Sequence, residues 1–255
     1  MKDNKKIYFA SDIHLGTPTY ADSREREAHF VAWLDAIFPT CEELFLVGDI
    51  FDFWFDYKTV VPKGYVRLFG KLAEFADAGI PIHFFYGNHD MWQRDYFEKE
   101  LGAKIHSDNI EFERNGKYFF VGHGDGKGPN DKKYKFLKKI FRNPICKWLF
   151  GWIHPDIGLR IANFWSRSSR YGKGEAKKEV FENADKEWLV SYVKRKMQTS
   201  SADYYIFGHR HLALDLKIED KVRYINLGDW LHYNSYAVFD GQNIELKYFQ
   251  KDNPS

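Results

Sequence analysis

The stretch IYFASDIHLG at residues 7–16 decides the fold, together with LFLVGDIFD at residues 44–52 and FFYGNHD at residues 84–90. Each begins with β-branched and aromatic residues, which are typical of a buried strand, and runs into Asp, Asn or His. Apolar residues at helical spacing lie between the three stretches. The order strand, helix, strand, helix, strand predicts an α/β fold.

The rest of the chain extends this pattern. The expected strands are 7–10, 44–47, 82–86, 118–121 and 204–207. The apolar helical faces are Phe30, Val31, Leu34 and Phe38, then Val66, Phe69, Leu72 and Phe75. After Phe207 come short strands at 224–226, 236–239 and 244–248, the last two joined by Asp240-Gly241. These later strands predict a partly antiparallel second sheet.

Charge divides the 255 residues into three parts. The chain has 38 Lys and Arg residues and 36 Asp and Glu residues. Residues 127–200 hold 18 of the basic residues and 7 of the acidic ones, so the rest of the chain holds 20 basic and 29 acidic residues. We therefore expect a core at 1–126 and 201–255, interrupted by a basic, aromatic helical insertion at 127–200. Such an insertion indicates an anionic partner: a phosphate-bearing substrate, a membrane surface or nucleic acid.

Cysteine and apolar content limit the class of protein. The two cysteines, Cys41 and Cys146, lie far apart, which favours neither a disulfide framework nor a zinc–thiolate site. No signal region and no stretch of about 18 apolar residues is visible. We expect a protein of the reducing cytosol that does not span a membrane.

Ligand-type side chains follow five of the expected strands, and glycine precedes four of these clusters. They are Asp12, His14, Asp49, Asn88, His89, His123, His209 and His211. Because sites in open α/β sheets form beyond the carboxyl ends of strands, we expect these side chains to converge at one edge. One such motif alone usually consists of polar side chains on the surface or a satisfied hydrogen bond, but five in register favour a metal centre. The other histidines, His29, His83, His106, His154 and His232, are expected to be structural or solvent-exposed.

Oxygen and imidazole ligands without thiolate suit Mn²⁺, Fe²⁺, Zn²⁺ or Co²⁺, and we favour Mn²⁺. Asp49 could bridge two ions. A pair of ions about 3.5–4 Å apart can activate water and neutralise a phosphate during in-line attack. The residues therefore predict metal-assisted hydrolysis of a phosphoric ester.

The five motifs resemble those of the calcineurin-like metallophosphoesterases. They read DIH from Asp12, GDIFD from Gly48, GNHD from Gly87, GHGD from Gly122 and GHRH from Gly208. The resemblance implies two facing mixed sheets flanked by helices around a dinuclear centre. One ion would be held by Asp12, His14, Asp49 and His211, and the other by Asp49, Asn88, His123 and His209. It also implies that His89 and Asp49 are catalytic, that Asp90 orients His89, and that Asp52 supports the ligands from behind.

Within that superfamily the chain is similar to the UDP-2,3-diacylglucosamine hydrolase family, which splits a lipid A precursor into UMP and 2,3-diacylglucosamine 1-phosphate. The FDFW run from Phe51, the GHGD motif and the insertion carry this resemblance. It implies a helical lid over acyl chains, a nucleotide-linked glycolipid substrate and a peripheral place on the inner face of the cytoplasmic membrane. The implied substrate contacts are Asn88, His89, Asp131, Tyr134, Arg167, Ser169, Arg170 and Lys173.

Two residues depart from the best-known hydrolases of that branch, which carry arginine and threonine where this chain has His89 and Arg210. Related enzymes with this core could hydrolyse another phosphodiester or phosphomonoester. A third hypothesis is a non-catalytic scaffold that uses the insertion to bind a partner, although no ligand position is lost.

The insertion can also be interpreted without the resemblance. Lysines and large apolar residues mix over 132–152, which suits either an anionic membrane or an ordinary solvated helical face, and Pro144 is expected to divide it into two helices. No nucleic-acid-recognition motif is visible, and we expect neither nucleic-acid binding nor an obligate protein partner.

Overall fold

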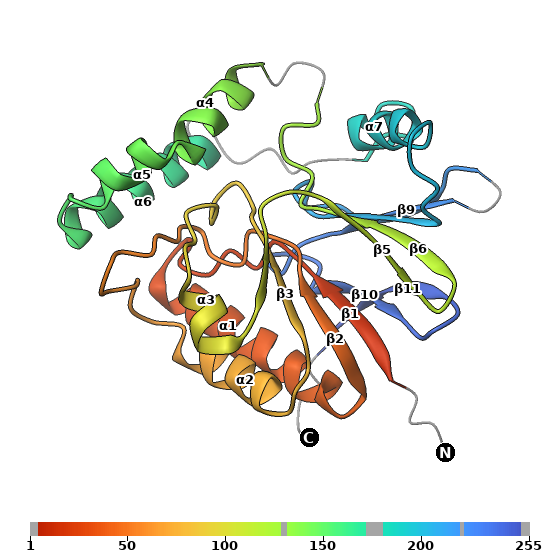
Figure 1. Ribbon diagram of the computed structural model, residues 1–255, viewed down its shortest axis with the longest axis horizontal. Coiled ribbons are helices and arrows are strands. Elements are labelled where there is room, and N and C mark those ends of the chain that lie inside the picture. The colour runs from red at the N-terminus through yellow and green to blue at the C-terminus, as the bar shows by residue number, and fades with distance from the viewer. Residues whose placement is uncertain (1–4, 129–131, 172–180, 220–221, 251–255) are drawn as a thin grey trace.

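Two mixed β-sheets face each other in the computed structural model, which describes residues 5–128, 132–171, 181–219 and 222–250 (Figure 1). The first sheet has the strand order β11-β10-β1-β2-β3-β4, and the second has the order β5-β6-β7-β9-β8. The first contains β1 (Lys6–Ala10), β2 (Cys41–Leu46), β3 (Ile82–Phe85), β4 (Lys104–His106), β10 (Ser235–Phe239) and β11 (Ile244–Tyr248). The second contains β5 (Ile110–Arg114), β6 (Lys117–Val121), β7 (Tyr204–Phe207), β8 (Ala213–Lys217) and β9 (Arg223–Leu227).

Alternation along the strands builds two layers of core at once. In β1, Ile7 and Phe9 pack between the sheets, whereas Tyr8 and Ala10 pack against the helices on the outer face. Successive side chains of a strand point to opposite faces, so one strand of apolar residues serves both layers. Burying a large apolar side chain stabilises the fold by roughly 1.5–3 kcal/mol, which explains why both faces of the central strands are apolar.

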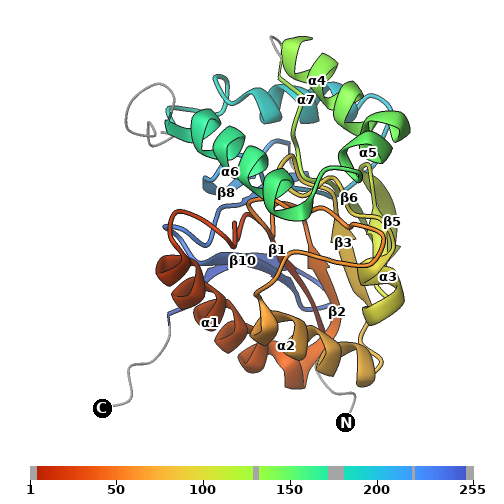
Figure 2. The same ribbon diagram turned by 90° about the vertical axis from the view of Figure 1, so that its left-hand side faces the viewer.

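Helices cover the outer faces of both sheets. The first sheet is covered by α1 (Tyr20–Ile37), α2 (Val66–Asp77) and α3 (Tyr96–Leu101), and the second by α7 (Trp188–Lys196). Figure 2 shows the first sheet packed on α1 and α2, with α4, α5, α6 and α7 at the opposite end of the molecule. The prediction of two facing mixed sheets flanked by helices is confirmed.

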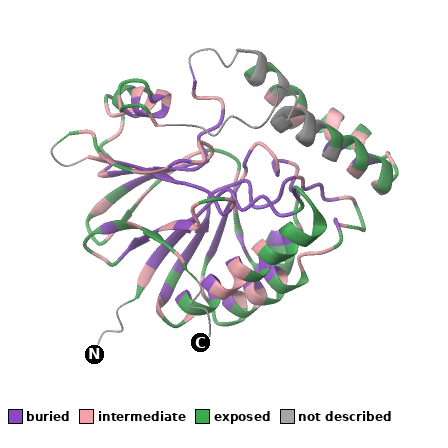
Figure 3. Ribbon diagram, turned by 180° about the vertical axis from the view of Figure 1, so that it is seen from behind, coloured by how far each residue is buried: buried purple, intermediate pink, exposed green. Residues whose placement is uncertain are grey.

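Three helices of the basic segment stand apart from these layers (Figures 1 and 2). They are α4 (Lys132–Arg142), α5 (Pro144–Phe150) and α6 (Pro155–Tyr171). The break predicted at Pro144 is confirmed, because Asn143 caps α5 by accepting hydrogen bonds from the backbone N–H groups of Ile145 and Cys146. Figure 3 shows the described parts of this group as mainly exposed or intermediate, in contrast to the buried strands. In the part of the chain that the structure describes, no helix is long and apolar enough to cross a membrane.

Two predictions about the fold are wrong in part. The strands after Phe207 do not all join the second sheet, because β10 pairs antiparallel with β1 and carries β11 into the first sheet. Val66 is 75% exposed rather than on the buried face of α2. That face is formed by Leu68, Leu72 and Phe75, at i, i+4 and i+7, while Val66 stands in the first turn outside the sheet contact.

Candidate metal centre

Five loops meet at the edge where the two sheets come together. Asp12 and His14 follow β1, Asp49 follows β2, Asn88 and His89 follow β3, His123 follows β6, and His209 and His211 follow β7. These strands belong to both sheets, and their loops are in direct contact. Nε2 of His123, from the second sheet, lies 3.2 Å from Oδ2 of Asp49, from the first. The expected convergence at one edge therefore spans both sheets.

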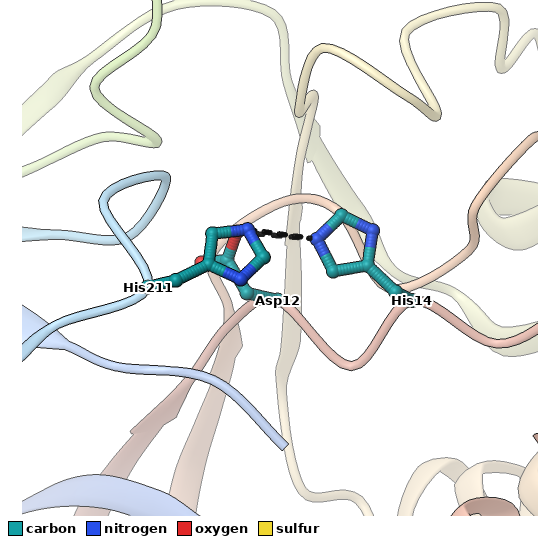
Figure 4. A group of neighbouring side chains, drawn as sticks. All are labelled: Asp12, His14 and His211. Carbon is teal, nitrogen blue, oxygen red and sulfur yellow. Dashed lines mark hydrogen bonds and ion pairs between the residues drawn. The ribbon is translucent and has the colours of Figure 1, made fainter. Parts of the chain in front are cut away.

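Asp12, His14 and His211 form one cluster, which we call site 1 (Figure 4). The Nε2 atoms of His14 and His211 lie 3.2 Å apart. Oδ1 of Asp12 lies 3.6 Å from Nε2 of His14 and 3.4 Å from Nε2 of His211. Ligands about 2.1 Å from a shared ion are separated by about 3.0–3.4 Å at right or tetrahedral angles. The spacing of site 1 is close to that of three ligands around one cation.

Asn88, His123 and His209 lie on the other side of Asp49 and form site 2. Nε2 of His123 lies 3.1 Å from Oδ1 of Asn88, and the ligand atoms of Asp49, His123 and His209 lie within 4.8 Å of one another. Asp49 Oδ2 is also 3.8 Å from Nε2 of His14 in site 1. The Asp49 carboxylate thus lies between the two sites, as a bridging ligand must.

The chemistry of the donor set fits cations. Nδ1 of His211 lies 3.0 Å from a carboxylate oxygen of Asp229, and Nδ1 of His123 lies 2.9 Å from the carbonyl oxygen of Val47. Those oxygens accept hydrogen bonds, so each Nδ1 carries a proton, and Nε2, which faces the cluster, is left to take either a proton or a cation. Oδ1 of Asp12 is buried without a hydrogen-bond partner among the described residues. Several acceptors therefore face one another, and a positive charge between them satisfies all of them.

The electrostatics of the cluster lead to the same conclusion. Burial alone disfavours a charged imidazole, yet the carboxylates of Asp49, Asp12 and Asp125 outweigh burial and raise the pKa of His123 to about 10. Burial and the neighbouring His123 lower the pKa of His209 to about 4. The pKa of Asp49 is held well below its usual range because the surrounding histidines outweigh its burial. The cluster thus attracts a cation while keeping Asp49 ionised.

Backbone strain is concentrated at this cluster. Five of the predicted ligands have left-handed backbone, which non-glycine residues rarely adopt: Asp12 (φ 55°), His14 (φ 49°), Asp49 (φ 53°), His209 (φ 68°) and His211 (φ 48°). Hydrogen bonds between the loops hold this strained backbone in place. The N–H of Asp12 donates to Gly48 O (3.1 Å), and the N–H of His14 donates to Asp49 O (3.0 Å). Strained residues persist where surrounding structure fixes them, and they gather at functional sites.

Two of the glycines before the ligands act in different ways. Gly48 has a φ of 84°, so it lets the chain turn sharply before Asp49, as the sequence suggests. Gly87 has no such φ, but a Cβ there would lie 2.1 Å from Oδ1 of Asp49. Gly87 is therefore required by the close approach of the Asp49 side chain.

The prediction that Asp90 orients the ring of His89 is wrong. The buried Asp90 carboxylate instead accepts hydrogen bonds from the backbone N–H groups of Gly87 (2.8 Å) and Ile50 (2.8 Å), which ties the second and third loops together. Burial and the nearby Asp49 raise the pKa of Asp90 to about 7. The Nδ1 of His89 lies 3.0 Å from Asp52 O and 3.7 Å from Asp52 Oδ1. Asp52 therefore takes the supporting role that was expected of Asp90.

Asp229 is a residue that the sequence analysis missed. Its carboxylate contacts the Nδ1 atoms of His211 and His232, at 3.0 and 2.9 Å. Gly228-Asp229 follows β9 as Gly48-Asp49 follows β2, so the signal that marked the other ligands was present. It was overlooked because β9 was treated only as part of a second sheet.

The ion pair of Arg210 with Glu187 was missed as well. The Nε atom of Arg210 lies 3.0 Å from Oε1 of Glu187, and its Nη2 lies 3.0 Å from Oε2, so the pair is bidentate. Glu187 is buried and also caps α7 through the N–H of Leu189. The contact joins the loop of His209 and His211 to α7, and the sequence alone gave no sign of this partner.

The expected substrate contacts of the insertion cannot be placed. Asp131 and Lys173 lie outside the described residues. Tyr134 belongs to α4, and Arg167, Ser169 and Arg170 belong to α6, but the described part of the chain does not include their side chains.

Known proteins share this sequence along most of its length. The calcineurin-like phosphoesterase family model matches residues 5–213. A UDP-2,3-diacylglucosamine hydrolase of Porphyromonas gingivalis is 41% identical over 254 residues, which cover 95% of this chain and 97% of that protein. A UDP-2,3-diacylglucosamine hydrolase of Shewanella putrefaciens is 25% identical over an alignment that covers 95% of this chain and 96% of that protein. A dimetal phosphatase structure from Danio rerio aligns with a TM-score of 0.47 and 13% identity, over 93% of this chain and 92% of that one.

The five loops that converge at the candidate metal centre lie within the family match. Members of this family use dinuclear metal centres. With a relative at 41% identity along nearly the whole chain, this shows that the protein belongs to the calcineurin-like phosphoesterase family and is a hydrolase of phosphoric esters.

Proposed function

We propose that the enzyme binds two divalent cations and hydrolyses the pyrophosphate bond of UDP-2,3-diacylglucosamine, giving UMP and 2,3-diacylglucosamine 1-phosphate. The observation that carries the proposal is the convergence of carboxylate and imidazole ligand atoms on either side of Asp49: Asp12, His14 and His211 on one side, and His123 and His209 on the other. The substrate follows from the P. gingivalis relative, whose name specifies that glycolipid. The reaction would be a step of lipid A biosynthesis.

The proposed ligand sets follow the two sites. Asp12, His14 and His211 hold the first ion, Asn88, His123 and His209 hold the second, and Asp49 holds both. The bound ions would neutralise the phosphate oxygens and supply an activated water molecule for in-line attack. Mn²⁺ is our choice, with Fe²⁺, Zn²⁺ and Co²⁺ as alternatives, because imidazole and carboxylate ligands accept each of them.

His89 is the proposed catalytic histidine. Its ring lies edge-on to that of His14, with the centroids 5.0 Å apart, so it stands beside site 1. Because Asp52 O accepts a hydrogen bond from Nδ1, we assign to Nε2 the exchange of a proton with the leaving group, or the stabilisation of its charge. Asp52 would then hold the ring in position for either role.

The insertion, residues 127–200, is proposed to act as a lid over the acyl chains. The described side chains of its helices include a set of exposed apolar residues: Phe136, Ile145, Trp148, Leu149, Trp152, Ile157 and Phe164. Trp152 is 76% exposed, which is unusual for so large an apolar side chain. Exposed basic residues, among them Lys135, Lys139 and Arg160, accompany them. This combination suits a lipid and an anionic membrane surface.

Contacts near the candidate metal centre tie the proposed lid to the core. Lys138 of α4 forms an ion pair with the buried Asp125, which follows His123 by two residues. Trp92, in the loop after His89, donates a hydrogen bond from Nε1 to Phe141 O (2.7 Å) and packs its ring against Phe150, with centroids 4.6 Å apart. The same group that would cover a lipid is thus joined to two of the ligand loops. We further propose that the enzyme works in the cytoplasm, on the inner face of the cytoplasmic membrane.

The test is release of UMP from UDP-2,3-diacylglucosamine in mixed micelles by the Mn²⁺-loaded protein. UMP and the acylated sugar phosphate should form in equal amounts, and Asp49→Ala should abolish both metal binding and turnover. No turnover of this lipid by the metal-loaded protein would refute the substrate. A metal-free protein that still bound a partner through the insertion would favour the scaffold hypothesis.

A second candidate keeps the chemistry and changes the substrate. His89 and Arg210 differ from the residues expected for the best-known hydrolases of the branch. His89 lies beside site 1, and Arg210 stands between His209 and His211 in the chain. Another phosphodiester or a phosphomonoester would then be the substrate. Faster cleavage of a simple aryl phosphodiester than of the lipid, under the same metal conditions, would favour this candidate.

A further inference from the structure

The Asp229 carboxylate sits behind site 1 and serves four hydrogen-bond donors. Oδ2 accepts from the ring nitrogens Nδ1 of His211 (3.0 Å) and His232 (2.9 Å), and Oδ1 from the backbone N–H groups of His232 (2.8 Å) and Tyr233 (3.3 Å). Asp229 is fully buried. Each of these four contacts is with an N–H donor, which suits a carboxylate, because both of its oxygens only accept hydrogen bonds.

The two sites differ in what holds their histidines. In site 1, His211 is backed by the Asp229 carboxylate, and Nδ1 of His14 lies 3.6 Å from a carboxylate oxygen of Asp52. In site 2, His123 is backed by the neutral carbonyl group of Val47. A carboxylate behind a ligating histidine makes the ring a stronger donor and adds negative charge near the ion. Site 1 therefore has one carboxylate hydrogen-bonded behind His211 and a second near His14. The carboxylate near site 2, that of Asp125, is instead paired with Lys138.

We infer that Asp229 is a positioning residue that fixes the tautomer of His211 and makes site 1 the tighter of two unequal metal sites. A carboxylate only accepts, so Nδ1 of His211 keeps its proton and Nε2 faces Asp12 and His14 as a lone pair. The inference rests on the proposed dinuclear centre. It predicts that metal binds in two steps, with site 1 filled first.

Asp229 also holds the loop that continues to Tyr233, so a purely structural role must be separated from the role at the metal. His232→Ala is the matched control, because it removes the other ring held by the same carboxylate oxygen and leaves His211 intact. His232 is largely exposed, so this variant should fold. Asp229→Asn is the second variant, since it keeps the size and an acceptor oxygen but removes the charge.

The experiment titrates metal-free protein with Mn²⁺ and measures free Mn²⁺ by EPR spectroscopy. The wild type should bind two ions with different affinities, and His211→Ala should identify the tighter step by removing it. Asp229→Ala should weaken that step by about 10- to 100-fold and change the weaker step less than twofold, with Asp229→Asn in between. His232→Ala should change both steps less than twofold.

Different results would contradict different parts of the inference. An Asp229→Ala protein with wild-type affinities, equal weakening of both steps, or the same loss in His232→Ala would overturn the role of Asp229. An Asp229→Asn protein as tight as the wild type would overturn the contribution of charge. A wild-type protein that binds fewer than two Mn²⁺ ions would instead overturn the proposed centre on which the inference rests.

Discussion

Replacing His89 by alanine should lower kcat by about 10²- to 10⁴-fold while both metal ions stay bound. A general acid or base contributes a factor of this size, which corresponds to about 2.7–5.4 kcal/mol of activation free energy. The cost to folding should be smaller. The hydrogen bond from the ring to Asp52 O contributes about 1 kcal/mol net, and the side chain is 16% exposed, so water can reach the vacated space. The expected defect is therefore in rate and not in folding.

Three measurements on the same preparation separate these effects. UMP release gives kcat and KM, titration gives the Mn²⁺ stoichiometry, and urea unfolding of the metal-free protein gives stability. His89→Arg is the informative second variant, because it restores a cation at this position and should recover part of the lost rate. A loss below tenfold for His89→Ala would refute the catalytic role. Loss of one Mn²⁺ ion would instead make His89 a ligand, which its place within 4.8 Å of ligand atoms of His14 and Asp49 allows.

Other contacts give further predictions. Arg210→Met should lower the free energy of unfolding, measured in urea, by about 3 kcal/mol, because it leaves the buried Glu187 carboxylate without its bidentate partner. Adding Glu187→Gln should restore part of the lost stability. Equal stability of Arg210→Met and the wild type would contradict this prediction. His83 and Arg114 outweigh burial and lower the pKa of Glu43 to about 2. Since the folded pKa lies below the unfolded value near 4.5, up to about 3 kcal/mol of stability should be lost as pH falls from about 4.5 toward 2, and Glu43→Gln should show a flatter acid limb. Adding Mn²⁺ at 100 times its dissociation constant should stabilise the protein by about 2.7 kcal/mol per site, read as a rise in Tm that a chelator reverses.

Local sequence patterns carried most of the fold because they report burial. Short runs of apolar residues placed β1, β2, β3, β6 and β7 within one residue of their observed ends, except that β2 begins three residues before its predicted start. The short strands β4, β5 and β8 were not predicted, because they alternate polar with apolar residues over few positions. Strand pairing was not readable either. The residues of β10 form an apolar run that would suit either sheet, and only its hydrogen bonds to β1 decided which one it joins.

For the candidate site, the sequence by itself determined the side chains that converge, since each follows a strand and strand ends share an edge. It predicted Asp12, His14 and Asp49 without any tertiary information. Only the tertiary structure decided what stands behind them: the carboxylate of Asp229 behind His211 and the guanidinium of Arg210 against Glu187. The physical reason is the distance along the sequence over which each feature is determined. A strand and its loop are set by neighbours in sequence, whereas a hydrogen-bond partner 18 or 23 residues away is chosen by packing.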